Sequence, residues 1–303
     1  MDDSRETYQP PAEPAGKKVI GIRRLKEPMP TPIKTRIFTI ANQKGGVGKT
    51  TTAVNVAAAL AMGGLKVLVI DLDPQGNACT ALGVDRNDGP GMYEVLVHDQ
   101  PMVEVVKKVA GFPHLECAPA NATLAGAEIN MVSFVSRESR LKLALETFLS
   151  AREAEGARID YVIIDCPPSL GLLTVNALTA AGEVLVPIQC EYYSLEGLTL
   201  LLQTLGQVQQ MLNKNVKIST IVLTMFDSRT RLANDVADSV RQHFPKELID
   251  VPIPRAVRVS EAPSFNQTVM TYDAASPGAI AYMSVAREIA LRGSTAASGE
   301  QTA

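Results

Sequence analysis

The chain alternates between short apolar runs, typical of strands, and longer stretches in which apolar residues recur every three or four positions, typical of helices. The apolar runs predict strands at 37–40, 66–71, 114–118, 160–165, 183–188, 217–223 and 248–253. The helical spacing predicts helices at 54–62, 137–151, 194–211, 233–243 and 278–292. Strands that are apolar along their whole length are buried on both faces. The alternation therefore predicts an α/β fold: a doubly wound, mostly parallel sheet with helices on both faces.

The two ends of the chain lack this alternation. Residues 1–35 hold six prolines and show neither period, and residues 293–303 are small and polar. We expect a disordered, proline-rich arm at 1–35, one domain at 36–292 and a disordered tail at 293–303. The arm contains a basic cluster made of Lys17, Lys18, Arg23, Arg24 and Lys26. This cluster fits either a solvated tail or an arm that contacts DNA or a partner.

Composition argues against several classes of protein. The chain has 303 residues, 46% of them hydrophobic, which is enough for one large α/β domain. It has no run of 18 apolar residues and no apolar signal segment at its start, so we expect a cytoplasmic protein without a membrane span. The four cysteines form no C-x-x-C pair, which argues against a metal site or a disulfide framework. Because the net charge is −3, binding to nucleic acid would depend on a local basic patch.

A glycine-rich loop lies between the first predicted strand and the first predicted helix. Residues 40–52 read I-A-N-Q-K-G-G-V-G-K-T-T-T. Glycine has no Cβ, so the backbone here can approach an anion, and the loop N–H groups and the helix N-terminus can bind phosphates. Lys49 can reach the β- and γ-phosphates, and the Thr50 hydroxyl suits a Mg²⁺ ion. The loop and its context predict a nucleotide phosphate site.

Two predicted strands lead into aspartates at the same edge of the sheet as this loop. Asp165 follows four apolar residues in the Walker B arrangement, and it would hold Mg²⁺ opposite Thr50, directly or through a water. Asp71 ends another strand, and the two-residue period of an extended backbone puts Asp73 on the same side. In purely structural roles, Asp165 would be a cap or turn residue and Asp73 a turn residue. The convergence of three signals on one edge favours a ligand site.

The loop departs from the usual pattern G-x-x-x-x-G-K-[ST], because Gln43 replaces the first glycine and Lys44 adds a second lysine. The segment K-G-G-V-G-K-T-T at 44–51 resembles the deviant Walker A motif of the ParA/MinD group of P-loop ATPases. Segments 71–77 and 165–168 also resemble the ParA family. Segments 223–231 and 253–264 are similar to loops of its chromosomal (Soj) members. The resemblance covers about residues 36–292.

The resemblance implies a role for each of these residues. In the family the signature lysine, here Lys44, reaches across a dimer interface to phosphates bound by the other subunit and acts as an arginine finger does. Asp71 would support the Mg²⁺ shell, and Asp73 would position or activate the attacking water. The implied catalytic residues are Lys44, Lys49 and Asp73; the metal ligands are Thr50, Asp71 and Asp165; and the nucleotide-binding residues are Lys44, Gly45, Gly46, Val47, Gly48, Lys49, Thr50, Thr51 and Pro254.

Arginines in the two Soj-like loops imply a DNA-binding surface. In that family, arginines at the positions of Arg229 and Arg258 belong to such a surface, and Arg231 and Arg255 add charge nearby. Phosphate contacts need only clustered cations, so binding would be salt-dependent and without sequence preference. The alternative is that each arginine is a solvated surface residue. No helix-turn-helix pattern argues for sequence-specific recognition.

The resemblance therefore implies a chromosome-partitioning ATPase. We expect a homodimer that closes on ATP and Mg²⁺, binds DNA non-specifically, hydrolyses ATP slowly, responds to a ParB-type partner and associates with the nucleoid. The alternatives are a membrane-surface positioning ATPase like MinD, an iron–sulfur ATPase, a metabolic ligase such as a cobyrinate amidase, and a nucleotide-switched scaffold without turnover. The polar tail argues against the first, the unpaired cysteines against the second and the arginine loops against the third. The sequence does not distinguish the scaffold from a slow ATPase.

Overall fold

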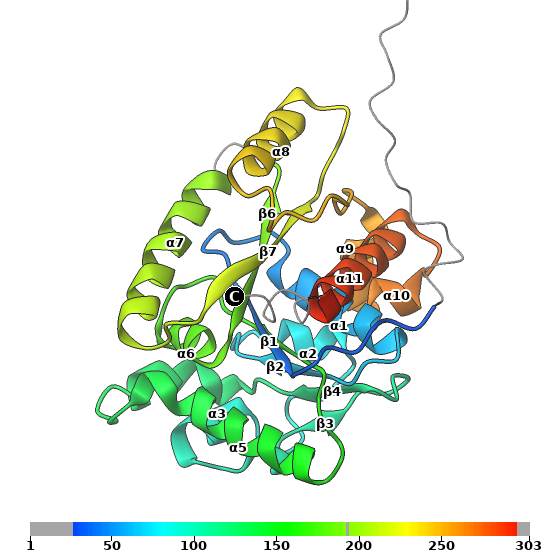
Figure 1. The fold of residues 1–303 in the computed structure, drawn as a ribbon. Coiled ribbons are helices and arrows are strands. Elements are labelled where there is room, and N and C mark those ends of the chain that lie inside the picture. The colour runs from blue at the N-terminus through cyan, green and yellow to red at the C-terminus, as the bar shows by residue number, and fades with distance from the viewer. Residues whose placement is uncertain (1–26, 192–193, 296–303) are drawn as a thin grey trace, which may run out of the picture.

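The computed structural model describes residues 27–191 and 194–295 (Figure 1). Within these residues the centre is a seven-stranded sheet with the order β3-β4-β2-β5-β1-β6-β7. All neighbouring strands are parallel except β3 and β4, which are antiparallel. The strands are β1 (Arg36–Ile40), β2 (Val67–Asp71), β3 (Lys107–Lys108), β4 (Leu115–Ala118), β5 (Tyr161–Asp165), β6 (Glu183–Gln189) and β7 (Lys217–Thr224). The predicted fold class is confirmed.

Helices connect the strands and cover both faces of the sheet (Figure 1). They are α1 (Lys49–Met62), α2 (Asn77–Ala81), α3 (Met92–His98), α4 (Ala127–Asn130), α5 (Arg140–Ala154), α6 (Leu172–Ala180), α7 (Ser194–Met211), α8 (Arg231–His243), α9 (Val257–Glu261), α10 (Val269–Tyr272) and α11 (Pro277–Thr295). The sequence pattern missed the short elements α2, α3, α4, α9, α10 and β3, because so few residues show no period. It also missed α6, whose buried residues include Thr174, Asn176 and Thr179, so that apolar spacing does not mark its buried side.

Alternate residues of the central strands are buried on opposite faces. In β2, Val67 and Val69 pack in the cluster that contains α1 and α11, whereas Leu68 and Ile70 pack in the cluster that contains α3 and α5. The same alternation occurs in β5. Both faces of these strands are therefore covered by helices, which explains why their sequences are apolar at every position.

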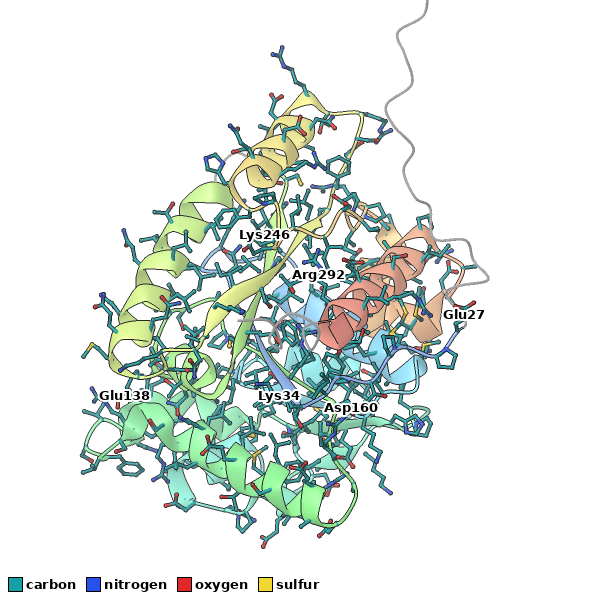
Figure 2. The ribbon with its side chains drawn as sticks, viewed as in Figure 1. Glu27, Lys34, Glu138, Asp160, Lys246 and Arg292 are labelled. Atoms are coloured by element: carbon teal, nitrogen blue, oxygen red, sulfur yellow. The ribbon has the colours of Figure 1, made fainter. Side chains whose placement is uncertain are left out.

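The predicted strand at 248–253 is wrong. Leu248 pairs with Ile221 of β7 only through an isolated bridge. The carbonyl of Leu248 accepts a hydrogen bond of 3.0 Å from Arg292 of α11, which is labelled in Figure 2. Ile253 donates to Leu223 of β7 at 2.8 Å. Between these two contacts lies Pro252, which has no N–H to donate to a ladder. The segment therefore follows β7 without becoming an eighth strand.

Part of the predicted arm lies within the described residues and packs on the body. Met29 is buried, and its N–H donates to Gly63 at 2.9 Å. Arg158 donates to the carbonyls of Pro32 and Ile33 at 2.8 and 2.6 Å. Ordered contacts therefore begin before residue 36, where we expected the domain to start. The basic cluster predicted in the arm lies outside the described residues.

At the other end, α11 continues past the predicted boundary to Thr295. Gly293 packs against the N-terminal edge of β1, where a Cβ on this residue would lie 2.6 Å from Nη1 of Arg36. Residues 293–295 are therefore helical, and the rest of the predicted tail lies outside the described residues.

Arg36 connects three elements at that edge. Its Nε and Nη2 donate to the two carboxylate oxygens of Glu183 in β6 at 2.7 and 2.6 Å. Its Nη1 donates to the carbonyl of Ile289 in α11 at 2.6 Å, and its guanidinium lies 4.7 Å from the ring centroid of Phe38. Only 14% of the Arg36 side chain and 17% of the Glu183 side chain are exposed, so the bidentate pair is largely shielded from water.

We predict that Arg36→Met lowers the free energy of unfolding by about 3 kcal/mol, because it leaves the Glu183 carboxylate buried without its partner. Urea denaturation would measure the change. Arg241→Met is the matched control, since Arg241 is 52% exposed and pairs only with Asp238 of its own helix among the ion pairs in the described chain. An Arg36→Met loss no greater than the control loss would contradict the prediction.

Candidate nucleotide site

The glycine-rich loop joins β1 to α1 at the carboxyl edge of the sheet. Gly46 and Gly48 have φ values of +74° and +87°, in the left-handed region that favours glycine. No atom lies within 4 Å of a Cβ built on Gly45 or on Gly46. The loop therefore leaves open space beside its backbone, and Gly48 is the N-cap of α1. This is the geometry that an anion bound by backbone N–H groups needs.

Two buried side chains hold the loop in place, one within the loop itself and one at the end of β7. Asn42 donates from Nδ2 to the carbonyl of Pro187 in β6 at 2.8 Å, and its Oδ1 accepts from the N–H of Lys44 at 3.0 Å. Thr224, the last residue of β7, donates to the carbonyl of Val47 at 2.8 Å. Both side chains are almost completely buried. Sequence analysis missed both residues, although a buried polar residue at the end of an apolar strand is a usable signal.

The two loop lysines have different partners. Lys49 is 7% exposed, and its Nζ donates to the carbonyl of Lys44 at 3.1 Å. Burial lowers the pKa of Lys49, and the charge of Asp165 opposes this effect. The Nζ of Lys44 donates instead to Oε2 of Glu191 at 3.1 Å. Lys49 therefore lies near the carboxylates that end the strands, whereas Lys44 is held on the side of β6.

Asp165 is the most isolated charged group of the site. It is completely buried, and neither carboxylate oxygen has a hydrogen-bond partner within the described chain. Burial, followed by the negative charge of Asp71, raises the pKa of Asp165 well above its usual value; Thr50 and Lys49 have smaller, opposite effects. A carboxylate left in this state is costly unless a cation joins it. Asp165 beside Thr50 therefore fits a Mg²⁺ ion.

Asp71 and Asp73 are held by backbone groups. Oδ1 of Asp71 accepts from the N–H of Asp73 at 3.1 Å, and Oδ2 accepts from the N–H and Sγ of Cys79, both at 3.0 Å. Burial raises the pKa of Asp71 to about 6. Asp73 is 8% exposed and accepts from the N–H of Gln75 at 2.9 Å. Because both oxygens of Asp71 are occupied, it suits an indirect, supporting role. Sequence analysis did not identify Cys79 as its partner.

The described residues contain no group of three or more His, Cys, Asp or Glu side chains placed to hold a metal by themselves. Mg²⁺ keeps several waters and is usually bound through one or two carboxylates together with substrate phosphates. Thr50 and Asp165 are then the protein groups best placed to hold it.

The two arginine-bearing loops run side by side next to this edge. Phe226, two residues after Thr224, bridges to Pro254, and its carbonyl accepts from the N–H of Arg255 at 3.2 Å. Thr224 contacts the glycine-rich loop, so this pairing leads from that loop to Pro254 and on to Arg255.

All four predicted DNA-contacting arginines are exposed, and each has an acidic neighbour. Arg229 lies 2.7 Å from Asp227, Arg231 lies 3.7 Å from Asp235, Arg255 lies 3.8 Å from Glu191, and Arg258 lies 3.1 Å from Glu261. Hydrogen bonds from Arg229 lower the pKa of Asp227 to about 2. Exposed ion pairs of this kind are weak in water, so a phosphate could displace the acidic partner.

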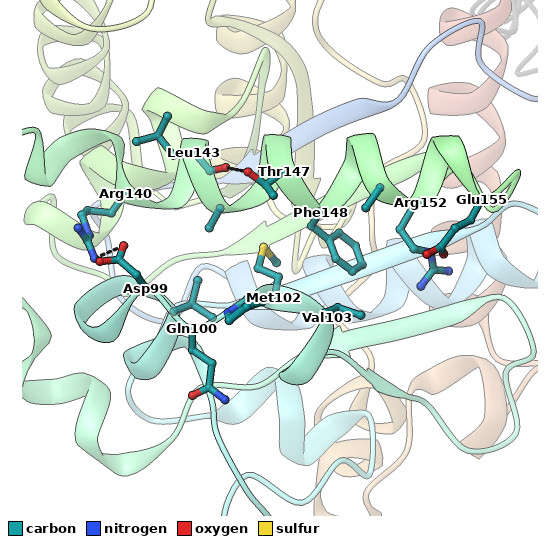
Figure 3. A pocket seen from close by; sticks show the side chains of 14 residues that line it. Asp99, Gln100, Met102, Val103, Arg140, Leu143, Thr147, Phe148, Arg152 and Glu155 are labelled. Atoms are coloured by element: carbon teal, nitrogen blue, oxygen red, sulfur yellow. Dashed lines mark hydrogen bonds and ion pairs between the residues drawn. The ribbon is translucent and has the colours of Figure 1, made fainter.

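A groove of about 330 Å³ lies elsewhere, between α5 and the segment that follows α3 (Figure 3). Met102 and Phe148 form its apolar wall, and the Asp99–Arg140 pair lies at one end. None of the predicted site residues lines this groove. The groove is therefore separate from the predicted nucleotide site at the carboxyl edge of the sheet.

Comparison with known proteins agrees with this geometry. A family model described as "AAA domain" matches residues 35–218. The chain is 48% identical over 259 residues to the sporulation initiation inhibitor protein Soj of Bacillus subtilis (strain 168), which covers 85% of this chain and 99% of that protein. It is 49% identical over 258 residues to the chromosome partitioning protein ParA of Caulobacter vibrioides (strain NA1000 / CB15N), and the match covers 85% of this chain and 94% of that protein. The chain belongs to the ParA/Soj family.

A solved structure extends the agreement for this ParA/Soj member. The structure is named cobyrinic acid a,c-diamide synthase from Mycobacterium smegmatis with bound ADP and magnesium. It is 38% identical in sequence, has a TM-score of 0.73, and covers 88% of this chain and 97% of that one. The resemblance and the P-loop fold predicted from the sequence are confirmed. No helix in the described part of the chain is long and apolar enough to cross a membrane.

We predict that, without Mg²⁺, the free energy of unfolding falls as the pH rises from about 4 to 7. The folded state holds protons on Asp71, whose pKa is raised from 3.8 to about 6, and on Asp165, whereas unfolded aspartates have already lost them. The shift of Asp71 alone corresponds to about 2–3 kcal/mol.

Asp165→Asn should reduce this pH dependence and raise the stability at pH 7 by about 1–2 kcal/mol, because it removes a buried carboxyl group that takes up a proton on folding. Chemical denaturation at several pH values in EDTA would measure both effects. Asp250→Asn is the matched control, because Asp250 is exposed. If Asp165→Asn kept the full pH dependence of the unchanged protein, Asp165 would not be the group responsible.

Proposed function

We propose that this chain is an ATP-dependent chromosome-partitioning protein that hydrolyses ATP slowly. The observation that carries the proposal is the buried, unpaired Asp165 carboxylate beside Thr50 and Lys49 at the base of an open glycine-rich loop. A loop of this kind binds phosphate, and the carboxylate suits the cation that accompanies it.

ATP and Mg²⁺ are the proposed ligands. The Mycobacterium smegmatis protein, 38% identical, has been solved with ADP and magnesium and also with an ATP analogue and magnesium. In this chain the loop residues 44–51 would hold the phosphates, with Thr50 and Asp165 at the metal and Asp71 supporting them. When bound, Mg²⁺ would neutralise charge between the phosphates.

The chain's own residues then have distinct tasks. Lys49 would exchange the carbonyl of Lys44 for a phosphate oxygen, gaining a charge-assisted hydrogen bond. Asp73, at the rim of the buried carboxylates, would orient the attacking water, because phosphoryl transfer depends mainly on positioning and charge stabilisation. Pro254 and its neighbours would lie against the base.

We further propose that ATP closes a homodimer in which Lys44 reaches the phosphates of the other subunit. The closed dimer would present Arg229, Arg231, Arg255 and Arg258 to DNA without sequence preference, which would place the protein on the nucleoid. A ParB-type partner would accelerate hydrolysis. The identity of 48–49% with Soj and ParA proteins over 85% of the chain supports these roles. In domain terms, residues 36–292 would form the ATPase, with the arm and tail flanking it.

The name of the Mycobacterium smegmatis protein raises a second candidate, a ligase that forms amides. A ligase that takes nitrogen from glutamine uses a reactive cysteine, and a reactive cysteine is a partly exposed thiolate. All four cysteines of this chain are buried, and burial contributes to a raised pKa for Cys79, Cys166 and Cys190. Within this chain the cysteines therefore favour the partitioning ATPase over the ligase.

The deciding experiment is binding to a mixed-sequence DNA duplex with ATP, with ADP and without nucleotide, across a salt series. We expect binding that needs ATP and weakens as salt rises. Lys49→Ala should abolish it by removing ATP binding, which a separate nucleotide titration would verify. Absence of DNA binding in all three nucleotide states would overturn the partitioning role while leaving the phosphate site intact.

We predict that Arg258→Glu weakens DNA binding at least tenfold and flattens its salt dependence without changing ATP affinity. Lys142→Glu is the matched control, because Lys142 is a half-buried cation on α5 whose side chain is 40% exposed, and α5 lies away from the arginine loops (Figure 1). Equal effects of the two changes would mean that only net charge matters, and the proposed surface would be wrong.

We predict that Asp73→Ala binds ATP but hydrolyses it at least tenfold more slowly, and that it accumulates as an ATP-bound dimer. Phosphate release and light scattering would measure the two effects. Asp235→Ala serves as the control, since Asp235 is an exposed aspartate on α8. Turnover of Asp73→Ala at the rate of the unchanged protein would exclude the water-positioning role.

A further inference from the structure

Lys44 is held by the segment between β6 and α7, as well as by its own loop. Its Nζ donates to Oε2 of Glu191 at 3.1 Å, and Glu191 comes two residues after the end of β6. The lysine side chain is 26% exposed and the glutamate side chain 46%. A pair this exposed is weak enough to break when a stronger anion is offered to the lysine.

The Glu191 carboxylate is itself oriented. Its Oε1 accepts a hydrogen bond of 2.6 Å from Nε2 of Gln189, and its backbone N–H donates to the carbonyl of Gln189 at 2.8 Å. Arg255 lies 3.8 Å from the same Oε1. One carboxylate oxygen is thus occupied by Gln189, and the other points to Lys44. Glu191 therefore holds Lys44 in a defined place.

The backbone of Lys44 is enclosed from the same side. A Cβ built on Gly197, in the first turns of α7, would lie 2.9 Å from Oδ1 of Asn42 and 3.5 Å from the nitrogen of Lys44. The contact at 2.9 Å is too close for a real Cβ, so α7 can approach this closely only because residue 197 is glycine. The carbonyl of Lys44 accepts from Lys49 on the other side. Every polar group of Lys44 therefore has a partner within this chain.

We propose that Glu191 is a positioning residue for Lys44. In the nucleotide-free chain it holds the signature lysine against the β6–α7 segment, and Lys44 reaches the phosphate of a second subunit only after leaving this carboxylate. The proposal rests on the proposed cross-subunit role of Lys44. When Lys49 binds a phosphate, it gives up its hydrogen bond to the Lys44 carbonyl. ATP bound in one subunit would therefore also loosen that subunit's Lys44, which is the residue that reaches the phosphates of the other subunit.

Removing the Glu191 charge should therefore favour the closed dimer. Glu191→Gln keeps the size of the side chain but weakens the pair, and we expect ATP-dependent dimerisation to tighten about two- to fivefold, the range for an exposed ion pair. In a Lys44→Ala background the same change should have no effect on dimerisation. A general electrostatic effect of Glu191 on the nucleotide would persist in that background, and a persisting gain would overturn the proposal.

The contact can be tested without nucleotide. Amine acylation followed by mass spectrometry would measure how fast Lys44 reacts in the unchanged protein, in Glu191→Gln and in the matched control Glu153→Gln, an exposed residue on α5. We expect Lys44 to react at least about twofold faster only in Glu191→Gln, with Lys142 as the internal reference. Equal Lys44 rates in all three proteins would overturn the proposal.

The two measurements separate the two ideas. Faster acylation of Lys44 together with a failure of every protein to dimerise on ATP would retain the Glu191 contact and reject the proposed dimer. Unchanged acylation together with normal ATP-dependent dimerisation would retain the dimer and reject the role of Glu191. Gly197→Ala offers an independent variant, since its Cβ would clash with Oδ1 of Asn42, which accepts from the N–H of Lys44. Displacing Asn42 should loosen Lys44 and raise its acylation rate while the Glu191 carboxylate remains.

Discussion

A buried carboxylate without a hydrogen-bond partner lies where the central strands end, and the organisation of the site follows from it. Asp165 is at the end of β5, between β1 and β2, with the glycine-rich loop beside it. Its charge is costly in the apolar interior, and Lys49 and Thr50 offset only part of this cost. The folded chain is therefore organised to receive a cation and the phosphates that accompany it.

The remaining polar contacts at this edge keep the site open. Asn42 ties the loop to Pro187 of β6, and Thr224 ties it to β7, while the space beside Gly45 and Gly46 stays free. The hydrogen bonds that Asp71 accepts hold it beside Asp165 without a cation. Contacts within the chain thus hold both the loop and the carboxylates in place. Such preorganisation is what phosphoryl transfer requires, since its catalysis consists mostly of positioning and charge stabilisation.

The phosphate loop and the arginine loops are connected through few residues. Thr224 contacts the loop, Phe226 pairs with Pro254, and Glu191 lies between Lys44 and Arg255. A change at the phosphate loop has a short path to the surface proposed for DNA. The path is made of exposed ion pairs and backbone pairing, which rearrange at low cost. Contacts that rearrange this readily suit a protein whose nucleotide state would select its partners.

The sequence by itself determined the sheet, the phosphate loop and the aspartates at the strand ends, because each is a local pattern: an apolar run, a glycine cluster, or a carboxylate directly after a strand. Only the tertiary structure decided the partners of those residues. Asn42 and Pro187 are 145 residues apart, Lys44 and Glu191 are 147 apart, and Val47 and Thr224 are 177 apart. No local period encodes such pairs, since they depend on which strands become neighbours. The strand wrongly predicted at 248–253 has the same origin, because apolar content favoured it, whereas pairing along β7 is interrupted between Ile249 and Ile253, where Pro252 has no N–H to donate.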